Sequence, residues 1–437
     1  MTARFESRAG AELNASRHSF DVLILGAGPA GLAAACCAAE SGQKVGVVDD
    51  NPDWGGQIWR RDRAKPSGKK ASRWMERIRS IAFEFLPSTQ IISQLHPGSL
   101  LAEQEGHPRE LNYQQLIVAT GARERFLPFP GWTLPNVMGA GGLQALVKGG
   151  LPIEGKRVAI AGTGPLLLAV AGYLHKQGAD IRLIAEQTSK KLLWRFGMSL
   201  WKHPGKAIEA TGLRLQLRQV PYRAGVWPIG AEGDKQLTSV TFTNGKTTWS
   251  MPCDYLACGF GLVPNTELPA LLGCARTAKG VHVDEMQRSS VPAVYCAGET
   301  TGIGGLDLAL IEGQIAGFAA TGRDRKARAL FPARKRAEAF ARRLEEAFVL
   351  RDELRQLPVP ETLVCRCEDV PFAKLKPYSS WTEAKLQTRC GMGTCQGRIC
   401  GPATEFLFGW QLQSVRPPLF PTNLVNLAGV SPEPVDA

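Results

Sequence analysis

The sequence predicts an α/β protein with two dinucleotide-binding units and a small cysteine-rich domain near its C-terminal end. Three observations predict this class. An apolar strand, a glycine turn and an alanine-rich helix follow one another between residues 20 and 40, and the same succession begins again at Arg157. Five of the eleven cysteines then gather between residues 365 and 400. A chain of 437 residues has room for two or three domains of ordinary size.

The first unit has the spacing G-x-G-x-x-G where its strand ends and its helix begins. Gly26 allows a sharp turn, Gly28 lets the backbone approach a pyrophosphate, and Gly31 lets the helix pack closely on the strand. The free N–H groups and the positive end of the helix then face the phosphates. The cofactor contacts expected in this turn are Gly26, Gly28, Pro29, Ala30 and Gly31.

A carboxylate follows the second strand of this unit, as the ribose of a dinucleotide requires. The strand from Lys44 to Val48 ends in two aspartates, at the distance from the turn where a carboxylate meets a ribose hydroxyl. A pair of glycines and a glutamine come next. The cofactor contacts expected in this stretch are Asp49, Asp50, Gly55, Gly56 and Gln57.

Two later segments have the small residues that a closely approaching flavin needs. A β-rich run ends in Ala119-Thr120-Gly121, and a buried strand from Ala293 ends in Gly298-Glu299. Glu299 is expected to hydrogen-bond the ribityl chain. The helix after Gly305 would aim N–H groups at the pyrimidine edge of the isoalloxazine, where reduced flavin carries negative charge. These residues predict FAD, and they make this distant strand the closing strand of the first domain.

The second unit departs from the fingerprint at one position. Gly162-Thr163-Gly164 follows the strand from Arg157, but Leu167 stands where glycine or alanine is expected for close helix packing. A strand from Asp180 leads to Glu186, so the fold is again of the nucleotide-binding kind. Bound NAD(P), another adenine nucleotide and a purely structural role all stay open for this domain.

The clustered cysteines suit a metal centre better than disulfides in a cytosolic protein. They are the C-x-C pair Cys365 and Cys367 and, in a glycine-rich segment, Cys390, Cys395 and Cys400. Four thiolates can hold zinc or an iron–sulfur cluster. The C-x-C spacing, the glycines and the flavin unit favour a [2Fe–2S] cluster, because a cluster can take the two electrons of a flavin one at a time. Zinc and plain thiols are the alternatives.

Residues 26–57, 119–121 and 298–299 resemble the two-dinucleotide-domain flavoproteins of the glutathione and thioredoxin reductase type. The resemblance implies a nucleotide domain inserted within a discontinuous FAD domain. One departure is decisive. Disulfide reductases carry a redox cysteine pair, but the stretch from Trp54 to Arg60 around the glycine pair has no cysteine, and no C-x-x-C occurs before residue 360. Disulfide reduction is therefore not expected.

The same resemblance implies the domain boundaries. Residues 329–358 would form a helical linker, which we expect to be one amphipathic helix from Phe331 to Leu357, ended by Pro358 and Pro360. The remaining parts would be an FAD domain at 18–125 and 252–328, an inserted second nucleotide-binding domain at 126–251, and a small helical [2Fe–2S] domain with a C-terminal tail at 359–437.

The cysteine segment resembles the [2Fe–2S] domain of the bacterioferritin-associated ferredoxin type. That type has its second cysteine pair in a G-C-G-x-C loop, where this sequence has Met392 at the third cysteine position. A thioether does not replace a thiolate here, and Cys400 becomes the substitute. The ligands implied by this resemblance are Cys365, Cys367, Cys395 and Cys400, with Cys390 as the alternative ligand or a spare thiol.

From about residue 20 to 425 the chain resembles one group more closely. These are the FAD-containing A (alpha) subunits of heteromeric, dye-linked amino-acid and amine dehydrogenases, such as opine oxidase, hydrogen cyanide synthase and D- or hydroxyproline dehydrogenase. The residues that carry this resemblance are Gly55–Ile58, Pro128–Pro135, Gly162–Leu168, Gly259–Asn265, Gly302–Gly305, Cys395–Arg398 and Arg416–Pro418.

This resemblance implies an electron-transfer subunit with FAD and a [2Fe–2S] cluster. An amino acid, opine or cyclic imino acid would be oxidised at another flavin, in a D-amino-acid-oxidase-like partner subunit. A small ferredoxin-like subunit is a further partner in such complexes. Two alternatives stay open: a stand-alone NAD(P)H-dependent FAD reductase, and a scaffold that keeps its cofactors only for structure.

The composition adds weaker expectations. The net charge is +12 with a pI near 9.3, but no basic run interleaves with aromatics, so nucleic acid is not expected as a partner. No apolar run reaches the ~18 residues of a membrane helix, and no signal peptide is recognisable. We expect a cytoplasmic protein that its partners can hold at the periphery of the inner membrane. The six histidines are scattered, and we assign no catalytic residue.

Overall fold

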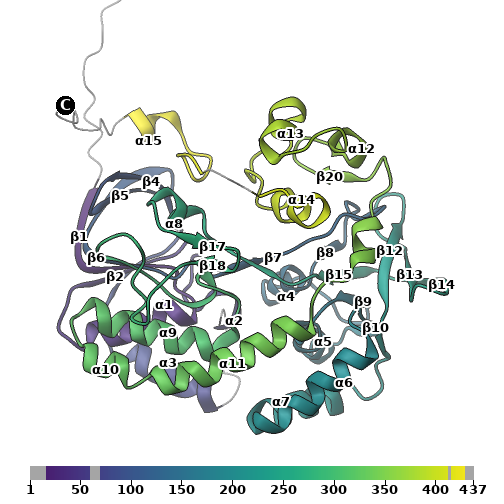
Figure 1. Cartoon of the computed structure of the whole chain (residues 1–437), viewed down its shortest axis with the longest axis horizontal. Coiled ribbons are helices and arrows are strands. Elements are labelled where there is room, and N and C mark those ends of the chain that lie inside the picture. Colours follow the sequence, from purple (N-terminus) through teal and green to yellow (C-terminus); the bar gives the residue numbers. More distant parts are fainter. Residues whose placement is uncertain (1–15, 60–68, 412–414, 429–437) are drawn as a thin grey trace, which may run out of the picture.

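The computed structural model describes residues 16–59, 69–411 and 415–428. Figure 1 shows three parts: a domain that contains the purple N-terminal strands, a teal second domain, and a yellow-green C-terminal domain at the top of the view. No helix within these ranges is both long and apolar enough to cross a membrane.

The first domain is built on a parallel sheet in the order β3-β2-β1-β6, and β19 also pairs in parallel with β6. As expected, a strand that follows the second domain in sequence closes this sheet. The last residues of β1 and β19 both lie beside Val118, so their carboxyl ends share one edge. The strands are β1 (Ser16–Leu25), β2 (Val45–Val48), β3 (Glu84–Leu86), β6 (His107–Val118) and β19 (Val294–Cys296).

Two helices of this domain cross at very short distance. They are α1 (Pro29–Ala39) and α9 (Gly305–Ala320). A Cβ atom on Gly313 would lie 2.1 Å from the carbonyl oxygen of Ala30, and one on Gly317 would lie 2.4 Å from that of Ala34. Only glycine therefore allows this crossing, which joins two segments far apart in the sequence.

Antiparallel strands extend the first sheet and support the end of the chain. Strands β4 (Thr89–His96) and β5 (Ser99–Gln104) pair with each other, and β5 pairs with β6. Leu419 is buried here, and its N–H donates to the carbonyl of Ile92 at 2.8 Å. The smaller elements of the domain are α2 (Gly56–Trp59), α3 (Lys69–Arg79), α8 (Glu267–Leu271), β17 (Arg276–Thr277), β18 (Gly280–Val281), η2 (Gly298–Thr300) and α10 (Asp324–Arg328).

Two short antiparallel strands, β7 (Ala122–Glu124) and β16 (Leu262–Pro264), connect the first domain to the second. The second domain repeats the plan with a parallel sheet in the order β11-β10-β9-β15-β8. Its strands are β8 (Val137–Gly139), β9 (Arg157–Gly162), β10 (Asp180–Glu186), β11 (Tyr222–Ala224) and β15 (Tyr255–Gly259), and its helical elements are α4 (Ala140–Lys148), α5 (Leu166–Lys176), α6 (Lys190–Ser199), η1 (Leu200–Lys202) and α7 (Pro204–Gln216).

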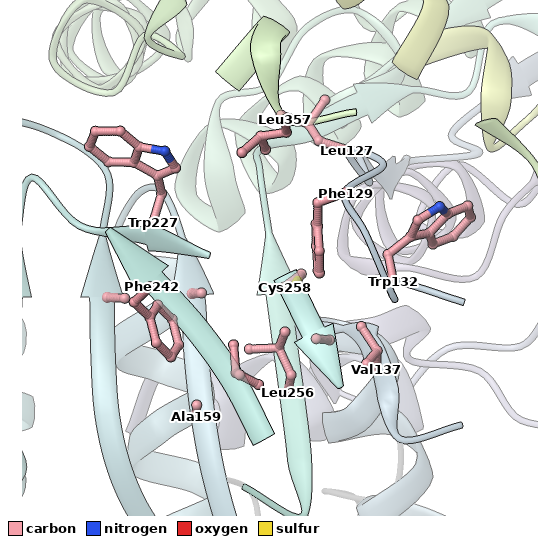
Figure 2. Packing of buried hydrophobic residues seen from close by; sticks show 14 of the residues in the cluster. Leu127, Phe129, Trp132, Val137, Ala159, Trp227, Phe242, Leu256, Cys258 and Leu357 are labelled. Atoms are coloured by element: carbon pink, nitrogen blue, oxygen red, sulfur yellow. The ribbon is translucent and has the colours of Figure 1, made fainter. Parts of the chain in front are cut away.

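A proline-rich linker helps to fill the core of the second domain. Figure 2 shows Phe129 of this linker beside Cys258 on β15, Trp132 on the far side of Phe129, and Leu357 close to Leu127. An antiparallel sheet closes the core with Phe242 and the neighbouring apolar residues. Its strands are β12 (Trp227–Glu232), β13 (Ser239–Thr243) and β14 (Thr248–Pro252).

The expected helix from Phe331 to Leu357 is shorter than predicted. Helix α11 (Phe331–Ala347) ends ten residues earlier, and a separate turn, η3 (Asp352–Gln356), follows it. The chain leaves the helix because residues 348–351 make other contacts. Phe348 packs edge-on against Phe196 of α6, at 5.1 Å between ring centroids. The guanidinium of Arg351 lies 3.9 Å from the ring centre of Trp227.

The C-terminal domain is a small helical unit with its own core. Trp381, Trp410 and Leu375 are buried in it together with three of the cysteines. The described tail after residue 415 leaves this unit and packs on the first domain through Leu419. The elements are β20 (Leu363–Cys365), β21 (Val370–Pro371), α12 (Phe372–Leu375), α13 (Trp381–Thr388), α14 (Cys400–Phe408) and, in the tail, α15 (Leu424–Ala428).

Candidate functional site

The first glycine turn has the tight geometry that the fingerprint predicts. Gly26 has a φ of 105°, and a Cβ there would lie 2.3 Å from the carbonyl oxygen of Ala119. A Cβ on Gly31 would lie 1.8 Å from the carbonyl oxygen of Gly26. A Cβ on Gly28 would meet nothing within 4 Å, so the backbone is open on that side at the start of α1. Pro29 and Ala30 follow as the first residues of this helix.

The aspartates lie at the carboxyl end of β2, and they have different environments. Asp49 is buried and accepts hydrogen bonds from the backbone N–H of Ala27 at 2.6 Å and of Asn51 at 2.9 Å. Asp50 is exposed and accepts from the side chain of Asn51 at 2.7 Å. Asp49 thus holds the glycine turn beside the end of the strand, and Asp50 lies next to it.

The glycine pair after β2 lies directly against the turn. The N–H of Gly55 donates to the carbonyl of Ala27 at 2.7 Å. A Cβ on Gly56 would lie 2.8 Å from Cα of Gly28. Gln57 is exposed, and its carbonyl accepts from the Nζ of Lys148 on α4 at 3.3 Å.

The segment after β6 joins the same edge. The N–H of Ala119 donates to the carbonyl of Leu25 at 2.8 Å. The N–H of Gly121 donates to the hydroxyl of Thr300 at 3.0 Å, and Thr120 donates its hydroxyl to the carbonyl of Asn265 at 3.1 Å. Gly121 has a φ of 67° and open space where a Cβ would lie.

Gly298 and Glu299 complete this edge next to α1. A Cβ on Gly298 would lie 2.7 Å from the Cβ of Ala30. The half-buried carboxylate of Glu299 has no hydrogen-bond or ion-pair partner among the described residues, and burial raises its pKa. Gly305 begins α9 with a φ of 77° and open space at its Cβ position. Both features fit a bound flavin: an unpartnered carboxylate for ribityl hydroxyls, and an accessible helix start.

The sequence did not single out Glu312, which supports this turn from inside α9. Its carboxylate accepts from the N–H of Gly298 at 2.8 Å and from the hydroxyl of Thr301 at 3.0 Å. Burial raises the pKa of Glu312 to about 7, and the hydrogen bonds from Thr301 and Gly298 oppose this. A carboxylate in the middle of a mostly apolar helix was the available sequence signal.

The second glycine turn is built in the same way around Glu186. This buried carboxylate accepts from the N–H of Gly164 at 2.8 Å and of Thr188 at 2.9 Å, and burial raises its pKa. Leu167 is fully buried and would lie 3.2 Å from a Cβ on Gly259. Gly259 on β15 thus provides the room for the leucine that replaces the third glycine.

The segment after α11 lies over this second turn. Gln187 follows Glu186, and its side chain donates to the carbonyl of Val349 at 3.0 Å and accepts from the N–H of Arg351 at 3.2 Å. The ring of Phe348 is 3.9 Å from the Cβ position of Gly164. Residues 348–351 of the chain therefore lie directly against the second glycine turn and the end of β10.

The clustered cysteines form two groups of contacts. The sulfur atoms of Cys365, Cys390 and Cys400 all lie within 4.8 Å of one another, and these three residues are buried. Hydrogen bonds from Cys390 and Cys400 lower the pKa of Cys365 far below its usual value. Cys367 and Cys395 interact with each other through their side chains. Cys395 also acts electrostatically on Cys390, so the two groups are neighbours, and Cys390, expected as an alternative or spare, belongs to the buried group.

Glycines shape the cysteine segment around one tryptophan. Gly391 and Gly397 have φ values of 81° and 80°. A Cβ on either would approach the ring of Trp381, at 2.5 Å and 3.1 Å respectively. The backbone N–H of Gly391 also hydrogen-bonds the Cys365 sulfur, as groups around a cluster sulfur do. Clustered thiols with backbone donors and without cross-links fit a metal–thiolate centre.

Arg123 of β7 connects the cysteine segment to the first domain. Its guanidinium donates to the carbonyl of Arg398 at 3.0 Å and to the side-chain oxygen of Asn265 at 2.7 Å, and pairs with Glu267 at 2.8 Å. Asn265 in turn donates to the carbonyl of Thr120 at 2.8 Å. The predicted flavin edge and the Cys395–Cys400 loop are thus linked by consecutive contacts, which sequence reasoning missed because they join distant positions.

The fold and these sites define a flavoprotein with two dinucleotide-binding domains and an attached cysteine centre. The opine oxidase A subunit from Rhizobium meliloti is 32% identical over 94% of this chain and 98% of its own length. Hydrogen cyanide synthase subunit HcnB from Pseudomonas aeruginosa is 30% identical over 86% of this chain and 90% of its own. The structure of L-proline dehydrogenase from P. horikoshii has the same fold, with a TM-score of 0.66 at 18% identity over 94% of this chain and 80% of that one.

The model of the pyridine nucleotide-disulphide oxidoreductases matches residues 20–316. The chain belongs to this family, and it is an FAD-dependent oxidoreductase. The predicted fold class and the resemblance to the A subunits are confirmed by these relatives.

Proposed function

We propose that this chain is the FAD- and [2Fe–2S]-carrying electron-transfer subunit of a dehydrogenase complex. The complex would oxidise an amino acid, an opine or a cyclic imino acid at a D-amino-acid-oxidase-like partner subunit. The names of the relatives, above all that of the opine oxidase A subunit, support this assignment. The observation that carries it is the contact of Arg123 with both Arg398 and Asn265, which ties the cysteine loop to the flavin edge.

The geometry supports the following roles for the chain's own residues. The open backbone at Gly28 and the start of α1 would bind the pyrophosphate, and the aspartates after β2 the ribose. Glu299 would accept hydrogen bonds from the ribityl hydroxyls, and the start of α9 would face the pyrimidine edge. When bound, the flavin takes up two electrons together and the cluster passes them on singly.

For the cluster we propose ligation by Cys365, Cys367, Cys395 and Cys400. Two observations support this set. Each contact group combines a cysteine of the C-x-C pair with a cysteine of the Cys395–Cys400 loop. Four thiolates also satisfy a [2Fe–2S] cluster, so the fifth is not needed. Cys390 would then remain a thiol beside Cys365.

Few groups near the flavin edge are free to remove a proton from a substrate. Asp49 and Glu312 both accept hydrogen bonds from backbone N–H groups. Asp50 accepts from the side chain of Asn51 and is assigned to the ribose, and Glu299, which has no hydrogen-bond or ion-pair partner in the described part of the chain, is assigned to the flavin itself. This supports a relay flavin, with substrate oxidation in a partner.

The second candidate, a stand-alone NAD(P)H-dependent reductase, fits less well. The hydrogen bonds of Gln187 hold residues 349–351 over the end of β10, where the ribose of a dinucleotide would lie. We therefore propose that the second domain does not deliver hydride. Anaerobic mixing of the purified protein with NADH or NADPH is expected to leave the flavin absorbance unchanged within the time of turnover. Rapid bleaching by either nucleotide would favour the reductase.

The relay is tested with the complex purified from its host and an amine as the electron source. Cys395→Ser is expected to abolish the visible absorbance of the cluster and amine-to-dye turnover, with FAD retained. Cys253→Ser is the matched control, because Cys253 is buried in the second domain and hydrogen-bonds the carbonyl of Tyr255, as serine can. Full turnover in the Cys395 variant would contradict the proposal, as would activity of this chain alone on an amine.

A further inference from the structure

We infer that α6, η1 and α7 form a surface that binds an anionic lipid bilayer. This surface belongs to the second domain, and the inference does not depend on the electron-transfer assignment. It rests on a row of exposed apolar side chains, on their orientation, and on the charge around them. We call these residues the apolar row: Trp194, Met198, Trp201, Ile208 and Leu215.

The apolar row is unusually exposed. Trp201 is 75% exposed, Ile208 73% and Trp194 67%. No residue of α6, η1 or α7 is fully buried. Single exposed apolar residues are ordinary on protein surfaces, but several large ones on neighbouring helices mark a site of interaction.

The inward faces of these helices already have partners in the chain. On α6, Phe196 packs against Phe340 and Phe348. On α7, Leu213 would be 3.0 Å from a Cβ on Gly172 of α5, and Gln216 donates to the carbonyl of Gly172 at 2.7 Å.

The apolar row lies away from these contacts. Residues 194 and 198 of α6 are four apart, and residue 201 follows three further on in η1, which directly continues α6. Residues 208 and 215 of α7 are seven apart, so each set lies on one side of its helical segment. Phe196 and Leu213 are off these sides by well over a quarter turn. In Figure 1, α6 and α7 form one extreme of the molecule, opposite the C-terminal domain, so a bilayer there would leave the cysteine segment accessible.

The charge around the row favours a lipid surface. Residues 190–218 contain one acidic residue, Glu209, whose carboxylate is 3.0 Å from the Nζ of Lys206. The basic residues of the stretch are Lys190, Lys191, Arg195, Lys202, Lys206, Arg214 and Arg218. Tryptophan and basic residues together are typical of helices that lie in the interface of anionic membranes. Lysine, by contrast, is depleted in protein–protein interfaces, and four of the seven basic residues here are lysines.

The experiment uses the full-length protein with its cofactors and large unilamellar vesicles. We expect co-sedimentation with phosphatidylglycerol-containing vesicles at least tenfold above that with pure phosphatidylcholine, and a decrease at high salt. Trp194→Ser with Trp201→Ser, and separately Lys190→Glu with Lys191→Glu, should each reduce binding about tenfold. Leu386→Ser is the matched control, since Leu386 is 67% exposed on α13 in the C-terminal domain.

A second measurement needs no variant. Brominated phosphatidylglycerol vesicles should quench part of the tryptophan emission of the wild-type protein, because the two tryptophans would lie at the acyl boundary. The inference is overturned if the wild-type protein stays in the supernatant with anionic vesicles, or if both double variants bind like the wild type. If the double variants bind vesicles like the wild type but lose a protein subunit that co-purifies with the wild type, the surface is a protein-docking site and the inference is also overturned.

Discussion

Glu312 is a buried acid whose pKa burial raises to about 7, well above the ordinary value of a glutamate. Its carboxyl lies beneath the Gly298–Thr301 turn, with Arg334 and Glu338 as the nearby charges. Because Glu312 accepts hydrogen bonds from Gly298 and Thr301 and has a pKa of about 7, a change of pH near neutrality changes the charge directly beneath this turn. Its raised pKa also has a consequence for stability.

We predict that Glu312→Gln flattens the pH dependence of stability. A folded-state pKa of about 7 against an ordinary 4.5 means that the native state binds the proton more tightly than the unfolded state. The stabilisation is complete below pH 4.5 and is lost as the pH rises to about 7, on the order of 3 kcal/mol at ~1.4 kcal/mol per pH unit. Melting temperatures between pH 4.5 and 8 measure this. The exposed, ion-paired Glu345→Gln should keep the wild-type slope, and an equal slope in the Glu312 variant would refute the linkage.

A second prediction at this scale concerns Glu299. Its carboxylate has no partner in the described structure, so Glu299→Ala should leave the apoprotein intact while weakening FAD binding. Hydrogen bonds to a charged group contribute roughly 1.5–3 kcal/mol, which raises the Kd for FAD about tenfold or more. Glu299→Gln should lose less FAD affinity than Glu299→Ala, because the amide oxygen of glutamine can still accept a hydrogen bond from a ribityl hydroxyl. Titration of apoprotein by flavin fluorescence quenching measures both, and equal affinity in all three proteins would remove Glu299 from the site.

At the scale of elements, variants of the cysteine segment can test which cysteines are cluster ligands and which only lie beside a ligand. Cys390→Ser is expected to keep the iron content and the visible spectrum, with small shifts from the changed neighbour of Cys365. Cys400→Ser is expected to lose both, although the two cysteines lie in the same buried group. Iron analysis and absorbance after identical purification decide the matter. The reverse pattern would assign Cys390 to the cluster and release Cys400.

The elements also show what could be predicted from the sequence. The turn at Gly26 was predictable, because the G-x-G-x-x-G spacing indicates the close backbone approach that the structure shows there, and Gly298 was predictable as a small residue at the end of a buried strand. The end of α11 was not, because Gln187, more than 160 residues away, takes the backbone groups of residues 349–351. Apolar periodicity up to Leu357 contains no information about such a partner. The role of Arg123 could not be predicted for the same reason, since the carbonyl of Arg398 and the side chain of Asn265 become its neighbours only in the folded chain.

At the scale of the whole molecule, several contacts fix the C-terminal domain to the other two. Trp132 of the linker donates its indole N–H to the carbonyl of Leu363 at 2.6 Å, and Arg355 donates to the carbonyl of Phe406. Arg398 donates to the carbonyl of Leu419 at 2.6 Å, which joins the cysteine loop to the returning tail. The C-terminal domain is therefore held both by the second domain, through Trp132, and by the first, through the tail at Leu419.

We predict that Arg123→Met slows electron transfer from FAD to the cluster without loss of either cofactor. The substitution removes the links to Arg398 and Asn265 while leaving the other anchors in place. Small displacements of reacting groups are costly, so we expect at least about a tenfold decrease in the rate of cluster reduction after anaerobic flavin reduction. Stopped-flow absorbance measures it. Arg182→Met, on a surface ion pair of β10, is the control, and a wild-type rate in the Arg123 variant would contradict the coupling.

The close crossing of α1 and α9 has a consequence for the order in which the protein is made. The glycine turn leaves the ribosome before the second domain is made, but the helix that contacts the backbone directly after this turn is completed only at Ala320, after the entire second domain. Until then the nascent flavin edge lacks Gly298, Glu299 and the start of α9. FAD loading is therefore expected to be a late event in biosynthesis. Chains ended after residue 251 should purify without flavin, whereas chains ended after residue 358 should retain it.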